Sequence, residues 1–388
     1  MKKLLIVNNN LHIGGVQKAL VHLLWHIRTR YEVTLLLFYP GGELLKELPP
    51  DIRVLTVDTA YRYLGMTGSD AQKRVFDMLG RTFFAGITRL FGRKTALWLM
   101  APGQRALTGY DEAIAYLHDA GESLFYGGCN TFVLQHVEAA KKIAFLHCDY
   151  SACGADTAAN ARQYARFDAI AACSQGCADS FLRANPALRE RVRVVPNCHR
   201  FEAVREMAAQ APITLDPTCF NVVTVARLGK EKGVERALEA LKSLNLPRDR
   251  LHYYVVGDGV QRSSLQRQII TYGLADTVTL CGALTNPYGY IRAADLLLIP
   301  SLSEAAPLVI GEAACLGTPI LSTATSSAQE MIVQKGWGFV CENTVERLTA
   351  SLNRLLEEPG LLRETARTLA DAVFEDRTAV EAFDRILG

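Results

Sequence analysis

Residues 303–319 read SEAAPLVIGEAACLGTP, and this stretch carries the strongest signal in the chain. Pro307 suits the first turn of a helix, because its missing N–H would have no partner there. Gly317 and the proline two residues later are typical of a helix end, so the stretch predicts a helix of about three turns. One glutamate precedes this expected helix and a second lies within it.

The start of this helix predicts a site for an anion that carries hydroxyl groups. The backbone amides of Ala306, Leu308 and Val309 would gather at the positive end of the helix dipole. Glu304 would accept a hydrogen bond beside the anion, and Glu312 would reach a neighbouring hydroxyl group from the helix flank. A ligand with both a diphosphate and sugar hydroxyls fits this arrangement. The alternative is a buried amphipathic helix with two incidental acids.

A second motif lies at residues 221–234, which read NVVTVARLGKEKGV. A strand is expected to end at Arg227, a loop with glycine follows, and Gly233 precedes a helix. This order places a guanidinium and an ammonium group at the mouth of a strand–helix turn. Cations at such a place stabilise the negative charge that grows on a departing diphosphate. The alternative is a pair of exposed loop cations, which the accompanying glutamate motif disfavours.

Residues 301–330 closely resemble the Glu-x7-Glu signature of retaining glycosyltransferases of the GT-B fold, specifically glycosyltransferase family 4, or glycosyl transferases group 1. The resemblance implies that Glu304 contacts the donor sugar and Glu312 the ribose of a nucleotide. It also implies that Arg227 and Lys232 hold the donor diphosphate, with the other lysine of that loop a solvated neighbour. The two alanines after Glu304, where the family usually has a glycine and a bulky residue, are interpreted as subfamily variation.

Residues 257–259, Gly-Asp-Gly, form a weaker motif at the end of another expected strand. Arg262 stands where a dinucleotide-binding motif has its third glycine, so we disfavour that interpretation. By resemblance to family 4, Gly257 and Gly259 form the turn that borders the nucleotide. The backbone around Cys281 corresponds to the family's stretch that contacts the base.

The first domain contributes residues 12–17, His-Ile-Gly-Gly-Val-Gln, which resemble the family's glycine loop at the start of its first helix. Gly14 and Gly15 let backbone amides approach a phosphate or a sugar closely. Gln17 stands where the family often has glutamate and is assigned no role. The resemblance implies that His147 faces the donor sugar, the alternative being a structural histidine. Weaker candidates for the same region are Asp149 and Ser174.

Short apolar segments alternate with helical patterns, which predicts an α/β protein with parallel sheets covered on both faces. We expect two Rossmann-like doubly wound domains, at residues 1–200 and 201–370. The resemblance implies that they face each other across a cleft, with the acceptor bound by the first and the nucleotide-sugar donor by the second. It also allows a C-terminal helix at residues 371–388 to cross back to the first domain. The expected strands are residues 4–8, 32–38, 113–117, 142–146, 169–172 and 192–195, then 220–226, 251–256, 278–280, 296–299, 320–322 and 339–341.

The segment from residue 61 to 110 departs from this alternation. Between residues 78 and 110 aromatic and leucine side chains are interleaved with five basic residues and no acid. The basic residues are Arg81, Arg89, Arg93, Lys94 and Arg105. One interpretation is a surface that touches anionic membrane lipid. The favoured one is a helical insertion that packs its aromatic face on the first domain and keeps its arginines solvated.

Composition narrows the class of protein. The chain has 388 residues, with 42 basic against 40 acidic side chains and a net charge of +2, which gives no argument for a nucleic-acid partner. Ten cysteines in apolar settings are typical of reduced thiols. A zinc site from Cys148 and Cys153 with His147 or Asp149 is disfavoured, because no Cys-x-x-Cys pair accompanies them. We therefore expect no metal ligands.

The short apolar N-terminus and the lack of any long apolar run predict a cytoplasmic protein, with a peripheral place at the inner membrane face left open.

The resemblance to family 4 implies retaining, metal-independent transfer of a sugar. No cofactor is expected beyond the donor substrate, a nucleotide-diphosphate sugar of the UDP or GDP type. The acceptor is expected to be a carbohydrate or a lipid-linked molecule of surface polysaccharide or glycolipid synthesis. Metal independence agrees with the sequence, which contains no Asp-x-Asp motif. The alternatives are a GT-B nucleotide-sugar epimerase and a catalytically silent nucleotide-sugar-binding scaffold.

Overall fold

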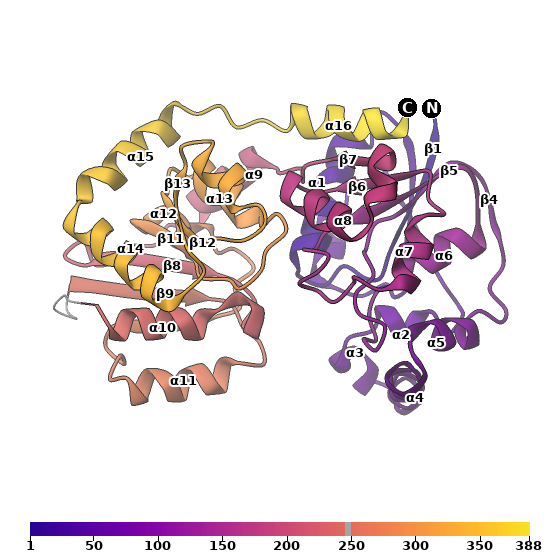
Figure 1. Ribbon diagram of the computed structural model, residues 1–388, viewed down its shortest axis with the longest axis horizontal. Helices are drawn as coiled ribbons and strands as arrows, with labels where there is room; N and C mark the ends of the chain where they lie inside the picture. Colours follow the sequence, from indigo (N-terminus) through magenta and orange to yellow (C-terminus); the bar gives the residue numbers. More distant parts are fainter. Residues whose placement is uncertain (245–249) are drawn as a thin grey trace. The chain divides into compact units, whose positions relative to one another are not determined.

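The computed structural model describes residues 1–244 and 250–388, which form two compact units (Figure 1). Unit 1 comprises Met1–Cys198 together with Asp376–Gly388, and unit 2 comprises His199–Glu375. Each unit is built around its own parallel sheet. Among the described residues, no helix has both the length and the apolar character that crossing a bilayer requires.

Unit 1 contains a seven-stranded sheet in the order β3-β2-β1-β4-β5-β6-β7, with every neighbouring pair parallel. Because β1 lies between β2 and β4, the strand order reverses there. Loops at such a switch point diverge and leave room for a ligand. The strands are β1 (Lys3–Asn8), β2 (Glu32–Leu37), β3 (Arg53–Thr56), β4 (Leu107–Ala115), β5 (Val137–Leu146), β6 (Ala169–Ala172) and β7 (Val192–Val194).

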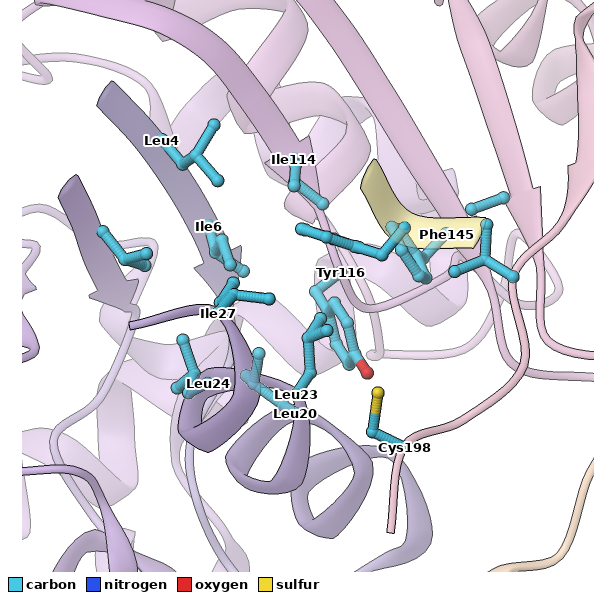
Figure 2. Close-up of a cluster of buried hydrophobic side chains, with 14 of the residues drawn as sticks. Leu4, Ile6, Leu20, Leu23, Leu24, Ile27, Ile114, Tyr116, Phe145 and Cys198 are labelled. Atoms are coloured by element: carbon cyan, nitrogen blue, oxygen red, sulfur yellow. The ribbon is translucent and has the colours of Figure 1, made fainter. Parts of the chain in front are cut away.

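Helices cover this sheet and bury one continuous core. The core joins α1 to the central strands, and Figure 2 shows Leu20 and Leu24 of the helix beside Ile6 of β1 and Tyr116 after β4. Burying each such side chain stabilises the unit by about 1.5–3 kcal/mol. The helices are α1 (Gly15–Ile27), η1 (Glu43–Glu47), α2 (Arg62–Gly65), α3 (Gly68–Gln72), α4 (Val75–Phe91), α5 (Arg93–Met100), α6 (Cys129–His136), α7 (Ala158–Tyr164), α8 (Gln175–Ala184) and η2 (Pro186–Arg191).

The last helix of the chain, α16 (Arg377–Leu387), packs on unit 1. Phe383 is fully buried, with its ring 6.3 Å from the rings of both Tyr31 and Phe145. Asp384 of the same helix accepts a hydrogen bond from the Tyr31 hydroxyl group at 2.8 Å and pairs with Arg30 at 2.7 Å. Unit 1 is therefore completed by residues almost 180 positions beyond its main segment.

Unit 2 contains a six-stranded parallel sheet in the order β10-β9-β8-β11-β12-β13, and its switch point lies between β8 and β11. The prediction of two doubly wound α/β domains is confirmed. The strands are β8 (Phe220–Val225), β9 (Leu251–Val256), β10 (Val278–Gly282), β11 (Leu296–Ile299), β12 (Ile320–Thr323) and β13 (Gly338–Cys341). The helices are α9 (Phe201–Gln210), η3 (Lys230–Lys232), α10 (Val234–Lys242), α11 (Arg262–Thr271), α12 (Tyr288–Ala293), α13 (Leu308–Cys315), η5 (Gln329–Val333), α14 (Val345–Glu357) and α15 (Pro359–Asp371).

The segment from residue 61 to 110 forms the helices α2 to α5 and the start of β4, but its aromatic face does not pack as the favoured interpretation expected. Phe76 and Trp98 are 84% and 72% exposed, and Phe83 and Phe91 are also exposed. Phe84 packs inward, with its ring 5.6 Å from that of Tyr63. The expectation of a buried aromatic face is therefore wrong for most of these rings.

The expectation that the arginines of this segment stay solvated is wrong for Arg93, because its side chain is buried. Its guanidinium group donates to Asn160 Oδ1 at 2.6 Å and to the Ala120 carbonyl oxygen at 2.8 Å, and it lies 3.7 Å from Asp119. This arginine fixes the loop after β4 to the rest of unit 1.

Replacing Phe383 with alanine should lower the free energy of unfolding by about 3–5 kcal/mol, because it empties the centre of the contact between α16 and unit 1. Thr378→Ala, at an exposed position of the same helix, should change it by less than about 0.5 kcal/mol. Urea unfolding followed by circular dichroism measures both. Equal stability of the two variants would contradict the packing of α16.

Candidate functional site

The switch point of unit 2 brings the two strongest sequence motifs together. Gly233, between η3 and α10, has a φ of 65°, and a Cβ atom there would lie 2.1 Å from the Pro300 carbonyl oxygen. Only glycine allows this approach of the loop after β8 to the end of β11. The Leu302 amide also donates to the Glu231 carbonyl oxygen at 2.8 Å. The two loops are thus joined by backbone contacts.

Lys232 and Glu304 form an ion pair across these loops. Lys232 Nζ lies 2.7 Å from Glu304 Oε1, and the two side chains are 24% and 11% exposed. The Ser301 hydroxyl group donates to the same carboxylate oxygen at 2.7 Å, and Ser326 Oγ donates to the Glu304 carbonyl oxygen at 2.7 Å. The sequence predicted both residues for the site, and the structure places them in direct contact.

A polar network that sequence reasoning missed joins the loops that carry this pair. Arg236 of α10 donates to the Pro300 carbonyl oxygen at 3.2 Å and to Asn343 Oδ1 at 2.6 Å. Asn343 Nδ2 in turn donates to the carbonyl oxygens of Leu302 and Ala324, at 3.1 and 3.2 Å. The sequence could have pointed to Arg236, because a charged side chain stands there among the apolar positions of α10. It could not have pointed to Asn343, because a single asparagine carries no such pattern.

Arg227 is set apart from this ion pair. Its side chain is 76% exposed and pairs with Glu231 at 2.8 Å, in the turn that it begins. An exposed pair of this kind contributes little to stability, so the guanidinium group can exchange its partner easily. Lys230 is exposed, as the sequence predicted.

Gly257 and Gly259 lie beside the Arg227 loop for a structural reason. A Cβ atom at Gly257 would lie 1.8 Å from the Ala226 carbonyl oxygen, and one at Gly259 would lie 2.6 Å from the Leu228 carbonyl oxygen. The Leu228 amide donates to the Asp258 carbonyl oxygen at 2.9 Å. The two glycines therefore let the turns after β8 and β9 pack backbone to backbone.

Cys281, at the end of β10, lies next to this turn. The Gly257 amide donates to the Gly282 carbonyl oxygen at 2.8 Å, which joins the end of β10 to the glycine turn. Burial raises the pKa of the Cys281 thiol, so this thiol stays protonated at neutral pH. Any contact from this position to a base would therefore come from backbone groups or a neutral thiol.

The helix α13 begins at Leu308, with Pro307 as its N-cap in an extended conformation and not in the first turn as predicted. No side chain of the described residues caps this end, so the amides of Leu308 and Val309 have no side-chain acceptor. The helix is hydrophobic and lies in the core of unit 2. Its N-terminus follows the Glu304 loop directly, which retains the expected proximity of carboxylate and amides.

Glu312 is more enclosed than expected. It is 3% exposed, and it accepts a hydrogen bond at 3.3 Å from the hydroxyl group of Tyr288, at the start of α12. Glu312 stands one turn after Leu308, on the same face of α13. The hydroxyl group that lies beside Glu312 in the structure therefore belongs to a tyrosine of the protein itself.

Unit 1 places its candidate residues at its own switch point and directly after β5. Gly14 is the N-cap of α1, and a Cβ atom at Gly15 would have no described atom within 4 Å. The backbone at Gly15 therefore borders open space. His12, before this loop, pairs with the buried Asp70 at 2.7 Å, a contact that the sequence did not indicate.

His147 directly follows β5, and its ring packs 4.6 Å from that of Tyr116 and 5.6 Å from that of Phe145. Burial, with a smaller effect of His118, lowers the pKa of His147 to about 3, so the imidazole is neutral at physiological pH. Its Nε2 atom has no hydrogen-bond partner within residues 1–244 and 250–388. A buried polar atom without a partner is rare and is often found at functional sites.

Asp149 and Ser174, the weaker candidates, both make structural hydrogen bonds. Asp149 Oδ1 accepts hydrogen bonds from Ser180 Oγ at 2.7 Å and from the Ala152 amide at 3.2 Å. Ser174 caps α8, and its hydroxyl group accepts from the Cys177 amide at 3.1 Å. These contacts hold the loops around His147 in place.

Comparison with known proteins finds a family match within unit 2. Residues 209–372 match the family model described as glycosyl transferases group 1. An alpha-D-kanosaminyltransferase of Streptomyces kanamyceticus is 26% identical over 43% of this chain and 44% of its own length. A putative colanic acid biosynthesis glycosyltransferase, WcaL of Escherichia coli, is 30% identical over 36% of this chain and 37% of its own length. The chain thus spans less than half the length of these curated relatives.

The fold of the whole chain is shown by solved structures. Anabaena HepE, in complex with UDP and glucose, is 20% identical with a TM-score of 0.68 over 100% of this chain and 99% of its own. The two parallel-sheet units are those of GT-B glycosyltransferase structures, and the predicted fold class is confirmed.

Stability should depend on pH through the two buried histidines. The pKa of His118 is lowered to about 4 by burial and that of His147 to about 3, whereas an unfolded histidine titrates near pH 6.5. The unfolded chain therefore binds more protons between about pH 6.5 and 4. As the pH is lowered through that window, the free energy of unfolding decreases by about 1.4 kcal/mol per pH unit for each histidine. His147→Asn should remove one such contribution, measured by urea unfolding across the window. An unchanged slope would contradict the buried neutral imidazole.

Proposed function

We propose that this chain is a glycosyltransferase that takes a sugar from a nucleotide-diphosphate donor bound by unit 2. The observation that carries the proposal is the Lys232–Glu304 pair, held at the switch point of a sheet whose sequence matches the group 1 family. Ligands of doubly wound sheets bind at this place, beyond the carboxyl ends of the strands. An acceptor held by unit 1 would receive the sugar.

The charges at this switch point suit a leaving diphosphate. Lys232 would transfer its hydrogen bond from Glu304 to a phosphate oxygen, and Arg227 would exchange Glu231 for the same group. The amides at the start of α13 would add further donors. Such preorganised donors stabilise charge that develops in the transition state. Because cations and amides meet the diphosphate, the proposed reaction needs no metal ion.

Glu304 would then be free to accept hydrogen bonds from the donor sugar, while the Ser301 hydroxyl group keeps its carboxylate in place. Glu312 would accept from the ribose beside the Tyr288 hydroxyl group. In the reaction, the bond from the anomeric carbon to the diphosphate breaks and a bond to an acceptor hydroxyl oxygen forms on the same face, while the hydroxyl proton passes to the leaving phosphate oxygen. That outcome retains the configuration, and no protein side chain attacks the sugar. The neutral His147 would contact the sugar from unit 1.

The names of relatives guide the choice of substrates. WcaL is named for colanic acid biosynthesis, and another relative, LpsD of Rhizobium meliloti, for lipopolysaccharide core biosynthesis. The HepE structures contain UDP or UDP-glucose. We therefore infer a UDP-sugar donor, with GDP-sugars next, and a carbohydrate or lipid-linked acceptor of a bacterial surface polysaccharide or glycolipid.

Lys232→Ala should lower the rate of nucleotide release from the donor sugar by about a hundredfold or more, the effect of removing one oxyanion-type donor. Lys230→Ala, in the same loop but exposed, should stay within about twofold of the parent. A coupled assay for released UDP or GDP measures both. Equal loss in the two variants, or no loss at Lys232, would remove this residue from the mechanism. Sugar change without an acceptor would favour an epimerase.

We also propose that unit 1 contacts anionic membrane lipid through α4 and α5, at the inner face of the membrane. The exposed rings of Phe83, Phe91 and Trp98 share this surface with the exposed basic residues Arg89 and Lys94. Large exposed apolar patches mark interaction sites. Each basic side chain near an anionic surface contributes about 1 kcal/mol, and inserted rings add apolar burial.

Phe83→Ser/Phe91→Ser/Trp98→Ser should reduce co-sedimentation with phosphatidylglycerol vesicles by about tenfold or more. Val260→Ser/Val373→Ser, which changes exposed apolar residues of unit 2, is the matched control and should bind like the parent. This contact would be ruled out if the parent protein did not bind anionic vesicles, or if the triple variant bound them as the parent does.

A further inference from the structure

The carboxyl ends of β4 and β5 bring three side chains with metal-binding atoms to one place. A ring nitrogen of His118 and the Sγ atoms of Cys148 and Cys153 all lie within 4.8 Å of one another. β4 and β5 are neighbouring parallel strands, with Ala115 opposite Ala144. The residues that follow the two strands therefore meet, although about thirty positions separate them in the sequence.

The two cysteines are held by a tight turn. The Cys153 amide donates to the Asp149 carbonyl oxygen at 3.0 Å, and Cys153 Sγ lies 3.0 Å from Cys148 Sγ. The Oδ1 atom of Asp149 accepts hydrogen bonds from Ser180 Oγ and the Ala152 amide, which fixes this turn, and Asp149 is not a member of the cluster. Both thiols thus point into one small volume.

His118 enters the same volume from the loop after β4. It is buried, and its Nδ1 atom has no hydrogen-bond partner in the part of the chain that the structure describes. Burying such an atom without a partner is unfavourable, and metal coordination is one way to satisfy it. The next residue, Asp119, is fixed by the Gly128 amide at 2.7 Å, so the loop that carries His118 is well supported.

The surrounding charges allow a cation. Arg93, whose positive charge acts on His118, is balanced by Asp119 at 3.7 Å. Two thiolates and a neutral imidazole would carry a charge of about −2, which a divalent ion cancels. Soft thiolate ligands with an imidazole select zinc and similar metals over magnesium or calcium.

We propose that His118, Cys148 and Cys153 form a binding site for Zn²⁺, with three protein ligands in a tetrahedral arrangement and the fourth position open to a water molecule or another small ligand. Zinc–sulfur bonds of about 2.3 Å place two sulfur ligands roughly 3.7 Å apart, so the two thiols would separate slightly on binding. Cys153 is only partly buried and lies in a turn, so its side chain has room for this small movement.

From the sequence, the two cysteines were paired only with His147 or Asp149 as candidate metal ligands, and no metal was expected. His147 is not a member of the cluster, and Asp149 is occupied within the turn. The actual third ligand, His118, is joined to the cysteines by strand pairing alone. No local spacing motif could have revealed it.

The test uses the full chain, reduced and freed of metal with a chelator, and titrated first with Co²⁺ and then with Zn²⁺. We expect one equivalent of Co²⁺ to produce the visible absorption of a tetrahedral complex and the near-ultraviolet charge-transfer absorption of cobalt–thiolate bonds. Zn²⁺ should abolish both. Binding should also release about two protons, because both thiols are deprotonated as ligands.

Cys153→Ser should lose the charge-transfer absorption of one thiolate, and Cys148→Ser/Cys153→Ser should lose it entirely. His118→Asn should weaken binding by more than about a hundredfold, beyond the usual effect of an outer-shell change. Cys219→Ser, which removes a thiol from unit 2, should bind like the parent. Thermal melting of each metal-free variant shows whether it is folded. Proton release by the parent protein tests thiolate ligation without any substitution.

The proposal is overturned if the parent gives no tetrahedral cobalt spectrum. It is equally overturned if Cys153→Ser keeps the full thiolate absorption. A third contrary result is a Cys148–Cys153 disulfide in protein kept under reducing conditions, seen as a mass loss of two hydrogens that persists with Zn²⁺ present.

Discussion

The parallel pairing of β8 with β11 is the constraint on which the candidate donor site depends. It sets Leu296 beside Val222 and brings the loops that follow these strands into contact. Gly233 then allows the first loop to touch the Pro300 carbonyl oxygen, and Lys232 reaches Glu304. The sheet order, the glycine and the ion pair act together, and a change in any one of them would separate the cation from the carboxylate.

The Lys232–Glu304 pair also explains how the unliganded chain can hold its site ready. Two partly buried charges lose hydration, and each compensates the other while no ligand is bound. In the proposed reaction, a diphosphate would offer Lys232 a stronger partner and would release the carboxylate to accept sugar hydroxyl groups. Ser301, Arg236 and Asn343 would keep the loop in position during this exchange, because none of these contacts is to Lys232. These contacts suit a loop that is to receive a charged ligand without rearranging.

Much of the fold could be predicted from the sequence, because buried parallel strands form apolar runs that alternate with helices. β3 was missed for the corresponding reason: its four side chains are exposed or partly exposed, so no apolar run marks it. The sequence also marked Arg227, Lys232, Glu304 and Glu312 as site candidates, and the structure places Lys232 and Glu304 in contact.

What the sequence could not show depends on contacts between distant segments. Arg93 looks like one solvated base among five, yet it is buried against Asn160, and the aromatic rings near it are exposed. The enclosure of Glu312 by Tyr288 and the meeting of His118 with the two cysteines follow from packing between elements. Local pattern carries no information on such pairs.

A crystal structure of the full chain grown with UDP, and in parallel with GDP, tests the central claim most directly. The account predicts a diphosphate within hydrogen-bonding distance of Lys232 Nζ and of the amides of Leu308 and Val309, with the Lys232–Glu304 hydrogen bond broken. A nucleotide bound elsewhere, or a diphosphate that leaves Lys232 on Glu304, would contradict it.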